Sequence, residues 1–153
     1  MIEVAEVVFD RAESVAGVWD EIYPLLKQHW AEIAHHKDIA LDPDVEFYHK
    51  ADALGMVRVF TAREDEALIG YAVFFVKPNV HYKQVLVAQQ DILFVQKDKR
   101  GFGAKFIAWC DEQLKAEGVQ MSMHHVKEAH NFSPLLRRLG YELVDLIYVR
   151  RFF

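Results

Sequence analysis

The clearest pattern in the sequence is an apolar run that ends in a basic, glycine-containing turn and continues as an amphipathic stretch. Residues 85–95, VLVAQQDILFV, are rich in β-branched and long apolar side chains, which is typical of a largely buried central strand. The turn covers residues 97–103, KDKRGFG, and its two glycines would permit unusual backbone angles or the close approach of a ligand. From Ala104 the apolar residues recur at helical spacing, and Gly118 stands where a helix-ending glycine belongs. The sequence therefore predicts a strand, a turn and a helix in direct succession.

The same kind of reading predicts the other elements. In chain order they are a strand over 2–9, helical structure over 12–36, a short helix over 42–54, two hairpin strands over 56–62 and 67–76, a loop over 77–83, a strand over 119–126, a helix over 132–139 and a last strand over 141–153. Because Pro24 lies inside the first helical stretch, we expect that stretch to break into two helices near Tyr23.

Length and composition narrow the class of protein. A chain of 153 residues predicts one domain, 1–153, and 52% hydrophobic with 27% charged residues is typical of a folded soluble protein. The net charge of −5 makes nucleic acid an unlikely partner, although it leaves room for a local basic patch. The single cysteine, Cys110, favours a core position and a reducing cytoplasm. Glu3 and Glu6 interrupt the start of the chain and no apolar run reaches about 18 residues, so neither a signal peptide nor a membrane span is predicted.

The turn is also a candidate anion site. Amides of a first helical turn point outward, the helix dipole places about half a positive charge there, and a glycine lets a phosphate approach the backbone. Lys97, Lys99 and Arg100 add mobile positive charge. An ordinary strand-to-helix connection with solvated basic residues accounts for the same residues equally well. A dinucleotide fingerprint does not, because Phe106 stands where its third small residue would be, and the GK[ST] of a nucleotide P-loop is missing.

Residues 100–105, RGFGAK, resemble the acetyl-CoA signature R/Q-x-x-G-x-G/A of the GNAT N-acetyltransferases. The match holds at Arg100 and Gly103 and fails at Lys105. The order of the predicted elements is similar to the GNAT fold over nearly the whole chain, and residues 131–141 resemble the late helix of that family, which commonly ends in L-G-F or L-G-Y. With HYK at 81–83 and YVRR at 148–151, the chain most resembles acetyltransferase-like proteins carried by phages and prophages.

This resemblance implies a fold and a coenzyme. The fold is α/β (α+β), with a mixed central sheet of about six or seven strands, splayed at a V-shaped cleft and flanked by about four helices. Acetyl-CoA would be the co-substrate, and its pantetheine arm would pair with the main chain of Leu93, Phe94 and Val95. The other coenzyme-binding residues that the resemblance implies are Arg100, Gly101, Phe102, Gly103, Ala104, Lys105 and Asn131. Direct transfer from thioester to amine needs no acyl-enzyme, so Cys110 is not expected to act as a nucleophile.

Asp91 is the candidate general base. An amine of pKa 10.4 must lose a proton before it can attack, which costs about 4.6 kcal/mol at pH 7, so a proton acceptor is useful. An acid inside an apolar strand is costly unless it is paired or used, and acidic residues on this strand serve as base in many GNAT relatives. The alternative is an aspartate that is hydrogen-bonded to a neighbouring loop.

The general acid is harder to assign. The tyrosine that many relatives place four residues before the helix-ending glycine is replaced by Leu136. The substitutes that lie near in sequence are His124, His130, Ser133 and Tyr148.

For the acceptor we single out His81 and Tyr82, in the loop before the central strand, with simple loop packing as the alternative. The eight histidines do not predict a metal site, because neither an H-E-x-x-H motif nor a cysteine pair is present.

Three functions fit the sequence. The first is an N-acetyltransferase that acts on a primary amine of a small molecule or a protein. The second is a non-catalytic acyl-CoA-binding module, which Lys105 and Leu136 would favour. The third is modification of nucleic-acid bases, which the acidic net charge disfavours. The sequence leaves a monomer and a homodimer equally open.

Overall fold

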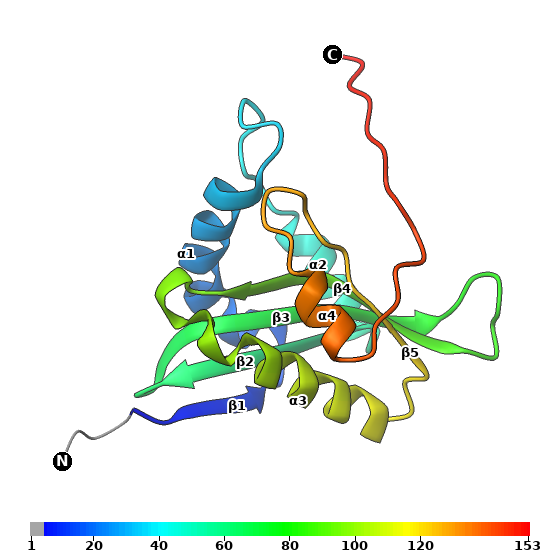
Figure 1. Cartoon of the computed structure of the whole chain (residues 1–153), viewed down its shortest axis with the longest axis horizontal. Coiled ribbons are helices and arrows are strands. Elements are labelled where there is room, and N and C mark those ends of the chain that lie inside the picture. Colours follow the sequence, from blue (N-terminus) through cyan, green and yellow to red (C-terminus); the bar gives the residue numbers. More distant parts are fainter. Residues whose placement is uncertain (1–4) are drawn as a thin grey trace.

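The computed structural model describes residues 5–153, which form one mixed sheet with helices on both faces (Figure 1). The elements are, in chain order, β1 (Val7–Arg11), α1 (Val15–Ile33), α2 (Val45–Ala53), β2 (Val57–Glu64), β3 (Ala67–Pro78), β4 (Leu86–Val95), a 3₁₀ helix (Lys97–Phe102), α3 (Gly103–Ala116), β5 (Met121–Met123) and α4 (Ser133–Arg138). The five strands lie in the order β1-β2-β3-β4-β5. Neighbouring strands are antiparallel, except that β4 and β5 are parallel.

Each face of the sheet carries its own hydrophobic core. Helix α3 packs on one face, where the buried residues are Phe60, Ala62, Ile69, Ala72, Phe74, Val76, Ala88, Val95, Phe106, Cys110, Leu114 and Val119. Helices α1 and α2 pack on the other, where the buried residues are Val15, Ile22, Leu25, Ala51, Val57, Val59, Leu68, Tyr71, Val73 and Phe94. The central strands supply both cores because successive side chains of a strand point to opposite faces. The core position expected for Cys110 is confirmed.

Most predicted elements are confirmed, with shifted ends. The hairpin, the central strand and the helices after residues 42, 103 and 132 form where the pattern places them. Gly118, at a φ of 97°, follows the end of α3, as a helix-ending glycine should. The first strand covers Val7–Arg11, where 2–9 was predicted, and residues 2–4 of that prediction lie outside the described part of the chain. The strand predicted over 119–126 is only three residues long.

The break expected near Tyr23 is wrong. Helix α1 continues through Pro24 for 19 residues. Proline inside a helix costs about 3 kcal/mol, but Ile22 and Leu25 are both buried on either side of it. Burial of two such side chains contributes about 3–6 kcal/mol, which is enough to hold the helix against the sheet.

The last strand, predicted over 141–153, is also wrong. After α4 the chain turns at Gly140, whose φ is 91°, and continues without pairing to any strand in residues 5–153 (Figure 1). The sheet therefore has five strands rather than the six or seven expected, while the mixed α+β fold with four α-helices is confirmed.

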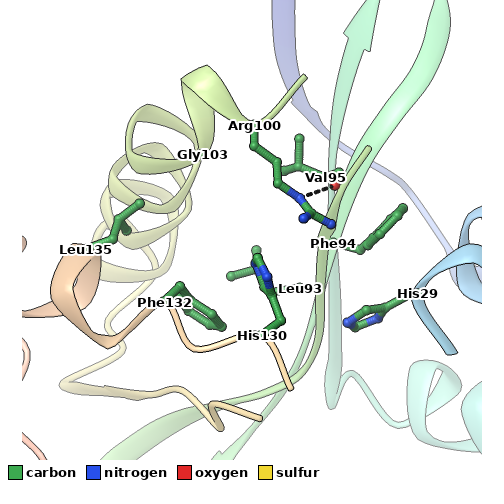
Figure 2. Close-up of a pocket in the computed structure, with 9 residues that line it drawn as sticks. All are labelled: His29, Leu93, Phe94, Val95, Arg100, Gly103, His130, Phe132 and Leu135. Atoms are coloured by element: carbon green, nitrogen blue, oxygen red, sulfur yellow. Dashed lines mark hydrogen bonds between the residues drawn. The ribbon is translucent and has the colours of Figure 1, made fainter. Parts of the chain in front are cut away.

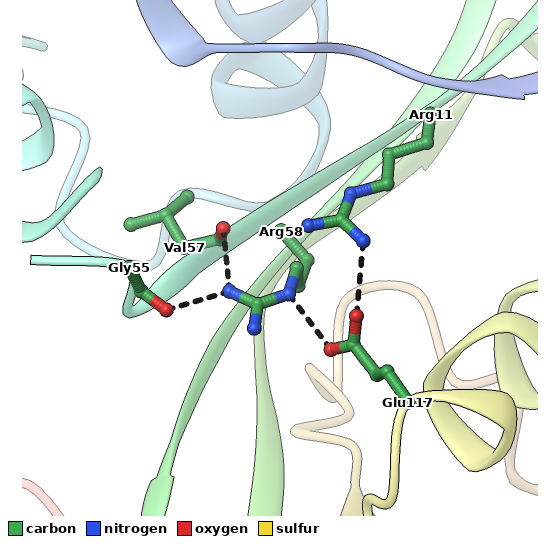
Figure 3. Close-up of polar contacts among 5 residues, drawn as sticks. All are labelled: Arg11, Gly55, Val57, Arg58 and Glu117. Carbon is green, nitrogen blue, oxygen red and sulfur yellow. Dashed lines mark hydrogen bonds and ion pairs between the residues drawn. The ribbon is translucent and has the colours of Figure 1, made fainter. Parts of the chain in front are cut away.

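Glu117 ties the end of α3 to the first strands. Its two carboxylate oxygens accept hydrogen bonds from Arg58 at 2.7 Å and Arg11 at 2.9 Å (Figure 3). Arg58 also donates to the carbonyls of Gly55 and Val57. One carboxylate thus joins the helix to β1 and β2, and this fixes the far end of α3 while its N-terminus faces the tip of β4. None of the helices in residues 5–153 is long and apolar enough to cross a membrane.

Candidate active site

The sheet opens between β4 and β5. The two strands pair only over three positions, from Val87 opposite Met121 to Gln89 opposite Met123. Beyond them β4 continues to Val95 and stays paired with β3. The segment after β5 no longer pairs with the main chain of β4, and the amide of His125 donates instead to the side-chain oxygen of Gln90 at 2.9 Å. The edge of β4 from Leu93 to Val95 consequently faces a slot instead of another strand of the described chain. An opening is expected here from the sequence, at residues predicted to bind the coenzyme.

A pocket of about 100 Å³ lies in this slot (Figure 2). It is lined by His29, Leu93, Phe94, Val95, Arg100, Gly103, His130, Phe132 and Leu135. Five of these residues, from Leu93 to Gly103, were predicted from the sequence. The other four come from α1, from the segment that leads into α4 and from α4 itself; of these, only His130 had been considered, as a general acid and not as a coenzyme residue. Because ligand pockets usually measure about 300–1,000 Å³, a molecule of coenzyme size would lie partly outside this one.

The remaining predicted coenzyme residues lie around the pocket without lining it. Phe102 packs on Phe9, with ring centroids 6.0 Å apart, in the core beneath α3. The side-chain oxygen of Asn131 accepts a hydrogen bond from the amide of Ser133 at 2.9 Å, in the turn just before α4. Gly101 and Lys105 are exposed.

The turn after β4 differs in part from the expected anion cradle. It forms a 3₁₀ helix, in which the amide of Lys99 donates to the carbonyl of Gln96, and the amide of Gly103 donates to the carbonyl of Arg100. These two amides are therefore turned inward. The amides of Ala104 and Lys105, in the first turn of α3, have no acceptor within their own helix. The start of α3 therefore suits an anion better than the whole of the turn at 97–103 does.

Neither glycine of the turn is required by the fold. Gly101 and Gly103 do not have the positive φ values that favour glycine, and a Cβ built at either position meets nothing within 4 Å. The expectation of unusual backbone angles here is wrong. Gly103 lines the pocket, so the close approach of an outside group is the remaining physical use for its missing side chain.

Arg100, the arginine that lines the pocket, is already paired with the carboxylate of Glu32. Arg100 donates to the main-chain oxygen of Val95 at 3.1 Å and to Glu32 of α1 at 2.6 Å. His130 lies 3.5 Å from the other oxygen of Glu32. The hydrogen bond from Arg100 holds the pKa of Glu32 below its usual value. An incoming diphosphate would have to compete with Glu32 for Arg100.

Replacing Glu32 by glutamine is expected to raise the affinity for acetyl-CoA about two- to fivefold, because Arg100 is released from an ion pair worth about 0.4–1 kcal/mol. Isothermal titration calorimetry measures the change. Glu112→Gln on α3 removes the same charge from an exposed site and serves as the control. Equal affinities for both variants and the wild type would show that Glu32 does not compete.

His29 forms an uncharged wall of the pocket. Its ring stacks on Phe94 with centroids 5.0 Å apart. Burial is the main reason that its pKa falls to about 4, although Glu32 acts in the opposite direction. At neutral pH the imidazole is therefore neutral, and it adds no positive charge to the site.

Asp91 stands at an irregularity of β4. Along β3, Val73 pairs with Ile92 but the next residue, Phe74, pairs with Gln90, so that Asp91 is the extra residue of a β-bulge. A bulge redirects side chains. Before the bulge, the even-numbered side chains of β4 face α3; after the bulge, the odd-numbered side chains face α3. The bulge thus leaves Asp91 on the face covered by α1 and α2, at the point where the slot begins.

The surroundings of Asp91 suit a proton acceptor. The hydroxyl of Tyr48, from α2, donates to the Asp91 carboxylate. Burial by the surrounding walls raises the pKa of Asp91, while the hydrogen bond from Tyr48 and the proximity of His125 lower it. The residue itself still reaches solvent, as a group that exchanges protons must. Its partner is a helix tyrosine and not a neighbouring loop, which was the alternative expected from the sequence.

Tyr48→Phe is expected to move the acidic limb of the pH–rate profile to higher pH. The substitution removes a hydrogen bond that favours the charged carboxylate, so the pKa of Asp91 rises and a higher pH is needed to ionise it. The profile of kcat/KM between pH 5 and 9 measures this shift. An unmoved limb would mean that the limb does not report Asp91.

One of the two expected acceptor residues, His81, lines a second pocket on the same face of the sheet as Asp91. This pocket, of about 220 Å³, is lined by Phe75, Lys77, Pro78, Asn79, Val80, His81, Val87, Gln89 and Met123. Phe75 packs against Tyr48, the partner of Asp91, with ring centroids 5.9 Å apart. The structure therefore brings His81 to a hollow beside the bulge. Tyr82 does not line it and is 61% exposed.

The candidates for the general acid differ in whether their side chains reach the slot. His130 lines the first pocket, whereas Tyr148 lies in the exposed C-terminal segment. His124 is buried among aromatic rings, and this burial lowers its pKa to about 4. Leu136 is buried in the core. Of the four substitutes considered, only His130 reaches the slot.

The described residues give no sign of a cysteine nucleophile or of a metal site. Burial raises the pKa of the Cys110 thiol far above its usual value, and the side chain lies in the core under α3. Within residues 5–153, no three side chains of histidine, cysteine, aspartate or glutamate lie together as a metal site would require.

Known structures share this architecture. The fold matches a ribosomal-protein-alanine N-acetyltransferase from Brucella melitensis biovar Abortus 2308 at a TM-score of 0.70, with 18% identity over 97% of this chain and 100% of the other. It matches a glucosamine-6-phosphate N-acetyltransferase from Arabidopsis thaliana at 0.71, with 9% identity over 97% and 99%. A predicted acetyltransferase from Clostridium acetobutylicum, solved with acetyl-CoA, matches at 0.69, with 12% identity over 95% and 96%. The sequence itself matches no family model and no curated protein. The similarity spans nearly the whole chain, and the protein has the fold of the GNAT acetyltransferases.

Proposed function

We propose that this protein is an N-acetyltransferase that uses acetyl-CoA to acetylate a primary amine. The observation that supports it most is the slot beside Leu93–Val95, which opens where β5 leaves β4 and ends at the N-terminus of α3. An extended, amide-containing chain can pair with a free strand edge, as a further strand would. A diphosphate suits the helix start and Arg100.

In this proposal the coenzyme and the amine reach the site from different sides. The coenzyme enters along the edge of β4, and the amine approaches from the face of α2, where Asp91 and the second pocket lie. Asp91 takes the ammonium proton, directly or through water, and the free amine nitrogen then attacks the thioester carbonyl carbon. The carbon–sulfur bond breaks, the nitrogen loses its second proton to solvent, and the thiolate of coenzyme A leaves and takes a proton from solvent or from His130. No acyl-enzyme forms, in keeping with the burial of Cys110.

An acceptor that carries an anionic group is the first choice for screening, because Lys77 and His81 both line the second pocket. The names of the similar structures cover both protein and small-molecule acceptors. A screen should therefore include amino acids, amino sugar phosphates and peptides with a free N-terminus.

Thiol release tests the proposal. The purified protein is mixed with acetyl-CoA and the amine panel, and free coenzyme A is measured with a thiol reagent, with calorimetric titration of acetyl-CoA in parallel. Amine-dependent thiol release is expected. Tight coenzyme binding without release for any amine would instead indicate a non-catalytic acyl-CoA-binding module, and absence of binding would contradict both functions.

A further inference from the structure

Within residues 5–153, the end of the chain pairs with no strand. The C-terminal arm, defined as residues 142–153, is extended, and every residue from 142 to 150 is exposed. Eight large apolar side chains are 69–88% exposed, namely Leu143, Val144, Leu146, Ile147, Tyr148, Val149, Phe152 and Phe153. An extended backbone with unpaired amides and carbonyls and apolar side chains is a template for strand pairing. An apolar surface of this kind marks an interaction site.

The arm is nevertheless held at both ends. Before it, the hydroxyl of Tyr141 donates to Asp111 of α3 at 2.6 Å. Near its end, Arg151 donates two hydrogen bonds of 2.9 Å to Asp38, in the loop that follows α1. These contacts restrict the arm before any partner arrives, which lowers the conformational entropy that binding must overcome.

The arm is complementary to a second copy of itself. In an antiparallel pair centred on Leu146, the acidic Glu142 of one copy stands opposite the basic Arg150 of the other. In the same register Leu143 meets Val149, Val144 meets Tyr148 and Leu146 meets Leu146, and the one mismatched pair is Asp145 with Ile147. Opposite charges and large apolar side chains are the favourable cross-strand pairs. Moving the register by one residue would place Arg151 opposite Glu142, but Arg151 is already bound to Asp38.

We propose that the C-terminal arm is a dimerisation strand whose partner is the arm of a second copy of this chain. The two arms pair antiparallel about a two-fold axis that passes through Leu146, which is the self-complementary arrangement that such symmetry requires. Val144, Leu146 and Tyr148 of both copies then share one face of the ribbon, with a Glu142–Arg150 pair at each end. The pairing gives partners to the open amides and carbonyls of both arms and brings their apolar side chains into contact along the ribbon.

The first test is the oligomeric state of the full chain, measured by light scattering at about 50 µM. The wild type is expected to be a dimer, and Leu146→Asp a monomer, because it places two carboxylates against each other on the axis. Leu54→Asp is the matched control, since Leu54 is 76% exposed and lies outside the arm; it should remain dimeric. Circular dichroism confirms that each variant is folded. A monomeric wild type, or a dimer that survives Leu146→Asp, would overturn the proposal.

The second test is crosslinking, which also reports the register. Opposed residues in an antiparallel pair have Cβ atoms about 5 Å apart, close to the separation in a disulfide. Leu146→Cys is therefore expected to form a covalent dimer on mild oxidation, whereas Leu143→Cys alone should not. Cys110 does not interfere because it is only 1% exposed. A dimer that Leu143→Cys links as readily as Leu146→Cys would show that the arm docks elsewhere, as would linkage by neither.

Discussion

Asp91→Asn is expected to lower kcat by about 10²-fold or more, which is the usual contribution of a general base, while the affinity for acetyl-CoA changes little. Asparagine keeps the size of the side chain and can still accept a hydrogen bond from Tyr48, but it cannot take a proton from the amine. The loss should be largest at low pH, where the amine is most fully protonated, and smaller toward pH 9. Steady-state kinetics across pH 6–9, together with calorimetric titration of acetyl-CoA, measure both effects.

Asp111→Asn provides a closely matched control. Like Asp91, Asp111 is a carboxylate that accepts a hydrogen bond from a tyrosine and whose pKa is raised by burial, but it lies on α3 and faces Tyr141. Its replacement should leave kcat within about twofold, as for a change away from the reacting atoms. If Asp91→Asn turns over as fast as Asp111→Asn at every pH, the amine loses its proton to another group.

The second large effect is expected for Gly103→Val, which should weaken acetyl-CoA binding by about tenfold or more, since one lost hydrogen bond to a charged group costs about 1.5–3 kcal/mol. The fold tolerates a side chain here, because a Cβ at Gly103 meets nothing within 4 Å. The added methyl groups would instead occupy the space beside the backbone of the first turn of α3, where the diphosphate is proposed to bind. Calorimetry measures the affinity, and thermal unfolding measures the stability.

Ala116→Val adds the same branched side chain to the exposed C-terminal end of the same helix, so it controls for the effect of valine on α3. We expect unchanged affinity for Ala116→Val and unchanged thermal stability for both variants. If Gly103→Val binds acetyl-CoA like the wild type, the diphosphate does not lie at the start of α3. A large drop in the melting temperature of Gly103→Val would instead mean that the glycine serves the fold.

The central part of the site was predictable because local chemistry determines it. The apolar run of β4, the turn and the amphipathic face of α3 all lie within about thirty consecutive residues, so short-range patterns were sufficient to place Arg100 and Gly103 at one slot. The same argument does not extend to His29 or Glu32. They belong to α1 and reach the slot only because that helix packs across the sheet, and periodicity gives no signal for such a contact.

Three structural features were not predicted from the sequence. Pro24 did not break α1, because burial on both sides outweighed a local preference. The two consecutive glutamines before Asp91 interrupt the alternation of β4, and this was a sign of the bulge that the sequence reading did not use. The C-terminal arm has the composition of a strand, yet a strand needs a neighbour. If the arms of two copies pair, the strand signal was correct for the dimer and wrong for the single chain.

Amide hydrogen exchange with and without acetyl-CoA tests the central claim most directly, because it reports both whether the coenzyme binds and where. Peptides that cover residues 93–105 should exchange more slowly when acetyl-CoA is present, since the edge of β4 and the first turn of α3 gain hydrogen-bond partners. Peptides from β2, over Val57–Glu64, should change much less. Equal exchange of residues 93–105 at saturating acetyl-CoA would contradict the account.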